Sequence, residues 1–473
     1  MIFDVAIVGA GVIGSMLARE LTRYKGSVCL LEAANDVACG ASRANSGIVH
    51  GGYDPEPGTL KAKLNTEGVE LLFETAKELN VSIIRNGSLV CAFSAEEDKT
   101  VKELYERGQI NHIPQLKILS GDEARALEPK LSQEVTSALY VPTAGIVCPY
   151  GLTIAAAGNA MDNGAQLKVN FRVASIKKEN GVFTVTAESG ETVLAKTVIN
   201  CAGCASGKIA ALAGDDSITI IPRAGEYMLL DKTAGATVKH TIFQVPSAAG
   251  KGILVSPTVH GNLLTGPTAK QVADGASTET TPEGLEDVRR LSLRSVPSVD
   301  FRSVITSFTG VRSSEKSGDF IIGWSEKVDG LLNVAAIDSP GLTCCVAIAK
   351  YVVSMLGQLE VNPDFYGHRA DPHAFRHMTV EQQDAFIKEH PAYGKIVCRC
   401  ETVSEGEILA AIRTNPPARD LDGVKRRTRS GMGRCQGGFC GPYIMELLAK
   451  EQNIPMEQVT KCGGNSYMVV GKV

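Results

Sequence analysis

The sequence has no excess of positive charge, no long apolar run, and no repeat or low-complexity tract. Its 473 residues carry 48 Lys and Arg against 52 Asp and Glu, a net charge of −4, so no general positive field exists to hold nucleic acid. The first apolar stretch, Val5 to Ala18, is broken by glycines and shorter than the roughly 18 apolar residues that span a bilayer. Because no basic region precedes it, it does not resemble a signal peptide. We therefore expect a cytoplasmic protein that is not an integral membrane protein.

The composition is that of a globular protein with a sizeable core. Hydrophobic residues make up 44% and charged residues 21% of the chain, which argues against extensive disorder and against a fibre. Glycine is abundant, with 48 residues, and indicates many tight turns or close approaches of the backbone to a ligand. In the cytosol, most of the 13 cysteines should be reduced or bound to metal.

The first residues read as strand, turn, helix and strand. The glycine-rich turn Gly9-x-Gly11-x-x-Gly14 follows the apolar strand Ile2–Val8, and Glu32 ends the next strand. Gly9 permits a tight turn, Gly11 lets the backbone approach a pyrophosphate, and Gly14 lets helix and strand pack closely. The Glu32 carboxylate would accept hydrogen bonds from a ribose. The pattern predicts a dinucleotide site but does not separate FAD from NAD.

Other segments resemble a family of flavoenzymes. They are Gly40-Ala41-Ser42-Arg43-Ala44-Asn45-Ser46-Gly47-Ile48-Val49-His50-Gly51-Gly52, Val198–Gly203, Pro222–Tyr227, Gly310-Val311-Arg312 and Asp338–Thr343. These segments resemble the D-amino-acid-oxidase-like superfamily, most of all its FAD-dependent glycerol-3-phosphate dehydrogenases and oxidases, and next its L-2-hydroxyglutarate oxidases. The resemblance covers about residues 1–365. It implies that FAD is held by Gly9, Gly11, Gly14, Glu32, Ser42, Arg43, Val173, Gly203, Gly341, Leu342 and Thr343.

The resemblance also implies a substrate site for an anionic secondary alcohol. His50 matches the residue assigned as the base, and a neutral imidazole can accept the hydroxyl proton near pH 7. Arg312 resembles the anion-binding arginine of the family. Its guanidinium can hold a phosphate or carboxylate through two hydrogen bonds. Lys251 resembles a lysine placed near the phosphate, although it could equally be an exposed loop residue. Ser46 and Ser339 match small hydroxyl donors at the substrate.

Two close pairs of cysteines mark the C-terminal part. Cys398-Arg399-Cys400 and Cys435-Gln436-Gly437-Gly438-Phe439-Cys440 could provide four thiolates for Zn²⁺ or for an iron–sulfur cluster. The C-x-C spacing is unusual for structural zinc. With its surroundings, the segment resembles the bacterioferritin-associated-ferredoxin-like domain, which binds a [2Fe–2S] cluster. The basic run Lys425–Arg429 is first interpreted as a solvated helix face, and alternatively as a docking patch for an acidic partner. Cys201, Cys204, Cys344 and Cys345 are expected to be packing residues.

We expect an α/β fold: a Rossmann-type FAD-binding domain with an antiparallel-sheet substrate domain (α+β), plus a small helical [2Fe–2S] domain. Residues 1–365 would form the oxidoreductase, with a discontinuous FAD domain at about 1–75, 145–210 and 305–365 and a substrate domain at about 76–144 and 211–304. Residues 366–394 would be a linker with one short helix, and 395–473 the cluster domain and tail.

The favoured function is oxidation of glycerol 3-phosphate to dihydroxyacetone phosphate, with electrons leaving through the cluster to an external protein or quinone-linked acceptor. Such a partner could hold the protein at a membrane surface. The alternatives are an L-2-hydroxyglutarate dehydrogenase, an amino-acid or opine dehydrogenase, and a redox-relay subunit whose flavin serves a partner's substrate.

Overall fold

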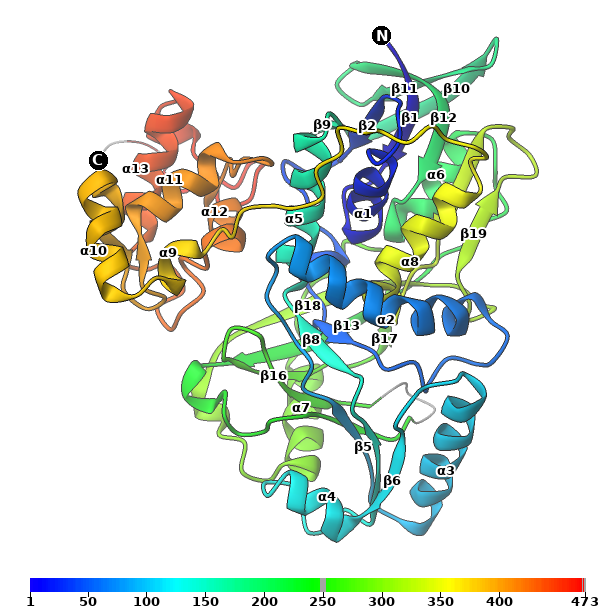
Figure 1. Cartoon of the computed structure of the whole chain (residues 1–473), viewed down its shortest axis with the longest axis vertical. Coiled ribbons are helices and arrows are strands. Elements are labelled where there is room, and N and C mark those ends of the chain that lie inside the picture. The colour runs from blue at the N-terminus through cyan, green and yellow to red at the C-terminus, as the bar shows by residue number, and fades with distance from the viewer. Residues whose placement is uncertain (247–251, 470, 472–473) are drawn as a thin grey trace.

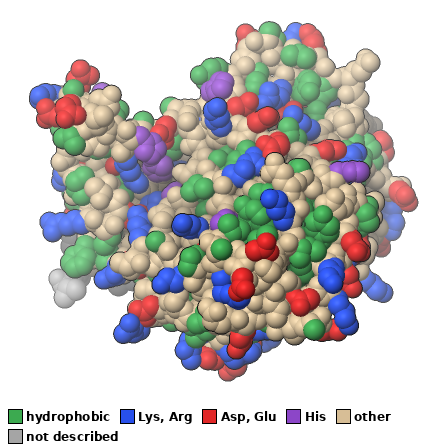
Figure 2. All heavy atoms as spheres, turned by 60° about the horizontal axis from the view of Figure 1, so that its bottom comes forward, with side chains coloured by type: hydrophobic (Ala, Val, Ile, Leu, Met, Phe, Trp, Pro, Cys, Tyr) green, Lys and Arg blue, Asp and Glu red, His purple; other side chains and the backbone are tan. Residues whose placement is uncertain are grey.

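The computed structural model describes residues 1–246, 252–469 and 471. Within these ranges the strands form two large sheets, and the C-terminal residues fold into a small helical domain at one side (Figure 1). Seen from another direction, this domain is a lobe against the main body, with histidine side chains gathered near the recess between them (Figure 2). No helix in the described ranges combines the length and apolar character needed to cross a membrane.

The first sheet has eight strands and begins with the predicted strand–helix–strand unit. Its order is β10-β11-β12-β1-β2-β9, with β20 beside β12 and β19 beside β20. The central strands β12, β1 and β2 are parallel, and the hairpin β10–β11 turns at Asn180-Gly181, as the sequence predicts. The strands are β1 (Ile2–Val8), β2 (Val28–Leu31), β9 (Gln166–Lys168), β10 (Val173–Glu179), β11 (Val182–Ala187), β12 (Thr192–Asn200), β19 (Ile321–Trp324) and β20 (Leu331–Ala335).

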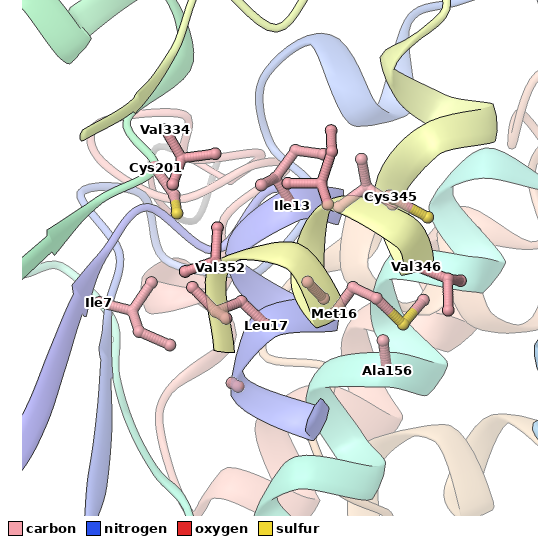
Figure 3. Close-up of a cluster of buried hydrophobic side chains, with 14 of the residues drawn as sticks. Ile7, Ile13, Met16, Leu17, Ala156, Cys201, Val334, Cys345, Val346 and Val352 are labelled. Carbon is pink, nitrogen blue, oxygen red and sulfur yellow. The ribbon is translucent and has the colours of Figure 1, made fainter. Parts of the chain in front are cut away.

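Helices α1, α5 and α8 pack together on one face of this sheet. Figure 3 shows Met16 and Leu17 of α1 among side chains from β1, α5 and α8. Cys201 and Cys345 lie in the same apolar cluster and Cys344 is fully buried, so the interpretation of these three as packing residues is confirmed. The helices of the main body are α1 (Val12–Leu21), α2 (Leu60–Glu78), α3 (Ala95–Ile110), α4 (Gly121–Leu127), α5 (Pro149–Asp162), α6 (Ser206–Leu212), α7 (Pro282–Ser295) and α8 (Gly341–Ser354).

The second sheet has nine strands, mostly antiparallel. Its order is β17-β13-β16-β15-β14-β5-β7-β6, with β18 paired to β13 along its length. The strand β18 therefore belongs to this sheet, although the expected boundary at residue 305 would assign it to the FAD domain. The strands are β5 (Ser88–Ala92), β6 (Lys117–Ser120), β7 (Ser137–Val141), β13 (Ile221–Leu230), β14 (Thr241–Gln244), β15 (Leu254–Pro257), β16 (Leu263–Gly266), β17 (Lys270–Gln271) and β18 (Val304–Ser314). A small sheet of β3 (Ile48–Val49), β8 (Gly145–Val147) and β4 (Ile83–Ile84) completes the main body.

The C-terminal domain includes part of the expected linker. Residues 366–394 contain two α-helices rather than one, α9 (Ala374–His377) and α10 (Val380–Glu389). Phe375 and Phe386 pack with Tyr393, whose ring lies against Gly406. This aromatic cluster holds the segment on the domain, a contact that the polar composition of the segment conceals. The other elements are β21 (Ile396–Cys398), β22 (Val403–Ser404), α11 (Glu405–Arg413), α12 (Leu421–Thr428) and α13 (Gly441–Gln452).

Candidate functional site

A cavity of about 2060 Å³ is lined by both large sheets. Val8, Leu31 and Val334, at the carboxyl ends of three parallel strands, form part of its wall, which is the edge where open α/β sheets bind ligands. The expected site residues on the wall are Gly9, Gly11, Glu32, Ser42, Arg43, Ser46, His50, Val173, Gly203, Arg312, Ser339, Gly341 and Leu342. Gly14 and Thr343 are not on the wall, and Lys251 lies outside the described residues.

The glycine-rich turn has no room for side chains. Gly9 has a φ of +106°, and a Cβ placed there would lie 2.5 Å from the carbonyl oxygen of Cys201. A Cβ at Gly14 would lie 2.0 Å from the carbonyl oxygen of Gly9, so this glycine allows α1 to pack against the turn. Gly11 faces the cavity at the start of α1. The positive end of that helix dipole is therefore directed at a site suited to a pyrophosphate.

Glu32 and Ser42 are held at the cavity wall by backbone hydrogen bonds. The two carboxylate oxygens of Glu32 accept hydrogen bonds of 2.8 Å from the N–H groups of Ala10 and Ala34. Burial raises the pKa of Glu32, against the effect of these donors. The Ser42 hydroxyl accepts a hydrogen bond of 2.8 Å from Val12 at the first turn of α1. The donor set and the glycine cradle fit a dinucleotide.

His50 lies on the cavity wall, directly after β3 of the small sheet. It is 6% exposed, and its ring stacks on Tyr53 with 5.0 Å between centroids. Its backbone N–H donates to Thr343 Oγ1 at 2.8 Å, and Asn65 donates to its carbonyl at 2.8 Å. Thr343, in the first turn of α8, accepts the hydrogen bond from His50 through its hydroxyl, and the expected role of its backbone at the flavin stays a prediction. The imidazole is thus held by packing and by fixed backbone contacts.

Tyr227 joins the expected substrate residues, although sequence reasoning gave it no role. Its hydroxyl lies 3.1 Å from Ser46 Oγ, and its ring stacks on Phe308. Burial raises the pKa of Tyr227, so the phenol stays protonated near neutral pH and can donate a hydrogen bond. Arg312 lines the same cavity and donates from Nη2 to the Thr268 carbonyl at 2.8 Å. The sequence signal that could have identified Tyr227 was its position at the end of the Pro222–Tyr227 segment.

The four cysteines of the two motifs in the C-terminal domain form two pairs, each with one cysteine from either motif. The sulfur atoms of Cys400 and Cys435 are 3.6 Å apart. Hydrogen bonding with the Cys440 thiol, and then with the backbone N–H groups of Gly431 and Glu401, lowers the pKa of Cys398 to about 6. Across the described ranges, no three His, Cys, Asp or Glu side chains form a group suited to one metal ion. Four cysteine thiols in two close pairs are the donor set of a [2Fe–2S] cluster.

Comparison with known families agrees with both sites. A family model described as FAD dependent oxidoreductase matches residues 4–355. The chain belongs to this family. A second model, described as BFD-like [2Fe-2S] binding domain, matches residues 396–450. The chain is therefore an FAD-dependent oxidoreductase with an attached [2Fe–2S] domain, and the cofactors and fold class expected from the sequence are confirmed.

The relatives include enzymes named for both of the leading candidate substrates. The glycerol 3-phosphate dehydrogenase of Caloramator mitchellensis is 44% identical over 473 residues, 99% of this chain and 98% of that protein. Human mitochondrial L-2-hydroxyglutarate dehydrogenase is 30% identical over 283 residues, 56% of this chain and 61% of that protein. The solved structure of dithionite-reduced L-α-glycerophosphate oxidase from Mycoplasma pneumoniae, with FAD bound, has a TM-score of 0.75 and 32% identity, and covers 78% of this chain and 98% of that one.

The basic run of the [2Fe–2S] domain is buried against the oxidoreductase, so both interpretations made from the sequence are wrong. Arg426 and Arg427 bind Asp36 at 2.6 and 2.8 Å. Arg429 binds Glu401 at 2.8 Å and also reaches Asn262 at 3.1 Å. Asp36, the acidic partner of Arg426 and Arg427, lies about 390 positions away along the chain, so the sequence around the run gives no sign of this pairing. These contacts hold the [2Fe–2S] domain to both sheets of the FAD-dependent oxidoreductase.

Proposed function

We propose that this FAD-dependent oxidoreductase oxidises glycerol 3-phosphate to dihydroxyacetone phosphate and passes the electrons through its [2Fe–2S] cluster to an external acceptor. One observation carries the proposal: His50, Tyr227 and Arg312 line one cavity with the residues suited to FAD. In the proposal these three residues serve as the base, the neutral donor and the anion-binding group of one site. The relatives named for glycerol 3-phosphate support the choice of substrate.

Each side chain has a defined task in this proposal. Arg312 binds the phosphate. A guanidinium has five N–H donors in a fixed fork, and the Thr268 carbonyl accepts from Nη2 only, so donors on the other nitrogens are left for the phosphate. Tyr227 and Ser46 donate hydrogen bonds to the substrate oxygens. His50 accepts the proton of the secondary hydroxyl as the carbon–hydrogen bond breaks. FAD, when bound, would supply the hydride acceptor, and a [2Fe–2S] cluster held by the four cysteines would supply one-electron transfer.

Anaerobic bleaching of the flavin tests the substrate. Glycerol 3-phosphate should bleach the bound flavin rapidly under anaerobic conditions. Arg312 could also hold a carboxylate, so L-2-hydroxyglutarate is the matched alternative. If L-2-hydroxyglutarate bleaches the flavin and glycerol 3-phosphate does not, the substrate assignment is wrong while the family stands. If no small molecule bleaches it, the relay interpretation is favoured.

Replacing Arg312 with alanine should weaken substrate binding by roughly 1.5–3 kcal/mol, the usual contribution of a hydrogen bond to a charged group. The reaction of glycerol, which lacks the phosphate, should be slow in the native enzyme and little changed by the substitution. The measurement is the substrate concentration that half-saturates the rate of flavin reduction. Arg302→Ala is the control, since Arg302 is 91% exposed and pairs with Asp300. Equal effects on glycerol and on glycerol 3-phosphate would separate Arg312 from phosphate binding.

The acceptor is proposed to dock at the exposed edge of the cluster site rather than on the basic run. Cys400 is exposed, and Phe439, which lies between Cys435 and Cys440 in the sequence, is 88% exposed. Arg399 and Arg434 are exposed beside the cysteines, which favours an acidic partner.

Lys251 stays a predicted phosphate ligand.

A further inference from the structure

The loop that follows Glu32 is shared between the FAD site and the [2Fe–2S] domain. Glu32, Ala33 and Ala34 line the cavity. The next two residues, Asn35 and Asp36, contact the other side: Asn35 donates a hydrogen bond to Asp420 at the start of α12. The residues on the cavity wall and those that hold the domain are therefore consecutive in the chain.

Asp36 is the centre of a buried charge cluster. It is 3% exposed and accepts hydrogen bonds from Arg426 Nη2 at 2.6 Å and from Arg427 Nη1 and Nη2 at 2.8 Å. Burial opposes its ionisation, but the charges of Arg427 and Arg426 hold the pKa of Asp36 below its usual range. Its Oδ1 also accepts from the backbone N–H of Val37 at 2.8 Å. Such a cluster is costly to break, because removing one partner leaves an uncompensated buried charge.

The [2Fe–2S] domain also reaches the cavity itself. Asp422, on the first turn of α12, lies on the wall together with Glu32 and with Arg43 of the segment 41–43. Asp422 is placed by its own domain, since Lys461 approaches its carboxylate at 3.3 Å and its backbone N–H donates to the Lys461 carbonyl at 2.9 Å. If the domain moved away, the cavity would lose this part of its wall and the Glu32 loop would lose its outer support.

We propose that the [2Fe–2S] domain is a structural part of the FAD site: α12 closes the end of the cavity beside Glu32, so that FAD binding and domain docking stabilise each other. The inference depends on FAD occupying the cavity and not on the identity of the substrate. Thermodynamic linkage makes the effect reciprocal, so the factor by which docking strengthens FAD binding equals the factor by which FAD strengthens docking.

Titration of the apoprotein with FAD, followed by flavin fluorescence, tests the first half of the proposal. Arg427→Gln should raise the dissociation constant of FAD by roughly 5- to 150-fold, the usual range for a coupling between two sites. Arg413→Gln is the matched control, because Arg413 lies on the same domain, is 61% exposed and pairs with Glu451. The control should bind FAD as the native protein does. Equal dissociation constants for the Arg427 variant and the native chain would overturn the proposal.

Hydrogen exchange on the native chain tests the second half without any substitution. With the cluster loaded, addition of FAD should slow amide exchange in α12 and in residues 366–373, which connect the domain to the main body. The cluster absorption shows whether the Arg427 variant keeps a folded [2Fe–2S] domain. If that variant does not, hydrogen exchange on the native chain decides the proposal alone. Identical exchange in the presence and absence of FAD would show that docking and FAD binding are independent.

Discussion

Replacing Cys435 with serine is expected to abolish the [2Fe–2S] cluster and to stop multiple turnover with the natural acceptor. Cys435 pairs with Cys400 at 3.6 Å, and loss of one thiolate removes a ligand that the cluster requires. Reduction of the flavin by substrate should persist, because His50, Tyr227 and Arg312 all lie in the other part of the chain. Iron content, the visible spectrum and single-turnover bleaching measure these three outcomes separately.

Cys462→Ser is the matched control for this experiment. Cys462 is an exposed cysteine of the same domain and is outside both pairs. The control should keep iron, cluster absorption and full turnover. Two results would contradict the proposed electron route: purified protein that holds zinc in place of iron, or a Cys435 variant that turns over normally with its acceptor.

His50→Gln should lower the rate of flavin reduction by roughly 10²–10⁴, the usual contribution of a positioned acid–base group. Glutamine can occupy much of the space of the imidazole but cannot accept the hydroxyl proton. FAD should remain bound, because Glu32, Ser42 and the glycine-rich turn are unchanged. Stopped-flow measurement of flavin bleaching under anaerobic conditions gives the rate, and the flavin spectrum gives the occupancy.

His377→Gln controls for the loss of a histidine elsewhere. Its side chain is 70% exposed and bonds Asp371, away from the cavity wall. The native rate of flavin reduction is expected in this variant. A His50 variant that reduces its flavin at the native rate would remove His50 from the mechanism and leave the proton to another group.

Local patterns predicted the parts of the fold that local interactions specify. The unit β1–α1–β2 follows from a glycine-rich turn between an apolar strand and a helix, and the hairpin β10–β11 from the turn at Asn180-Gly181. In each case the signal and the structure lie within about 30 residues. The sheet that receives β18 was not predictable in this way, because its partner β13 lies far away in the sequence.

The candidate site also divides into features that local sequence predicts and features that depend on contacts between distant segments. The glycine-rich turn, Glu32 and the two cysteine motifs could be singled out from the sequence because close spacing carries the chemistry predicted for them. Tyr227 was not assigned, since its role depends on a bond to Ser46 across two separate elements. The hydrogen bond from the backbone of His50 to the Thr343 hydroxyl was likewise not foreseen, because the two residues lie 293 positions apart.

By itself, the sequence indicated a dinucleotide site and a four-thiolate site, because glycines in a tight turn and thiols at short spacing carry that chemistry locally. The choice of FAD, of [2Fe–2S] and of the family came from the resemblance of longer segments, which also pointed to part of the cavity wall. Only the tertiary structure decided the meaning of the basic run. In the sequence, Arg426 and Arg427 belong to a basic run that is typical of a solvated surface. In the structure, both bind Asp36 at 2.6–2.8 Å, although Asp36 lies some 390 positions earlier in the chain. Charges separated by that length of chain pair only after both domains have folded and excluded water between them, which no local pattern records.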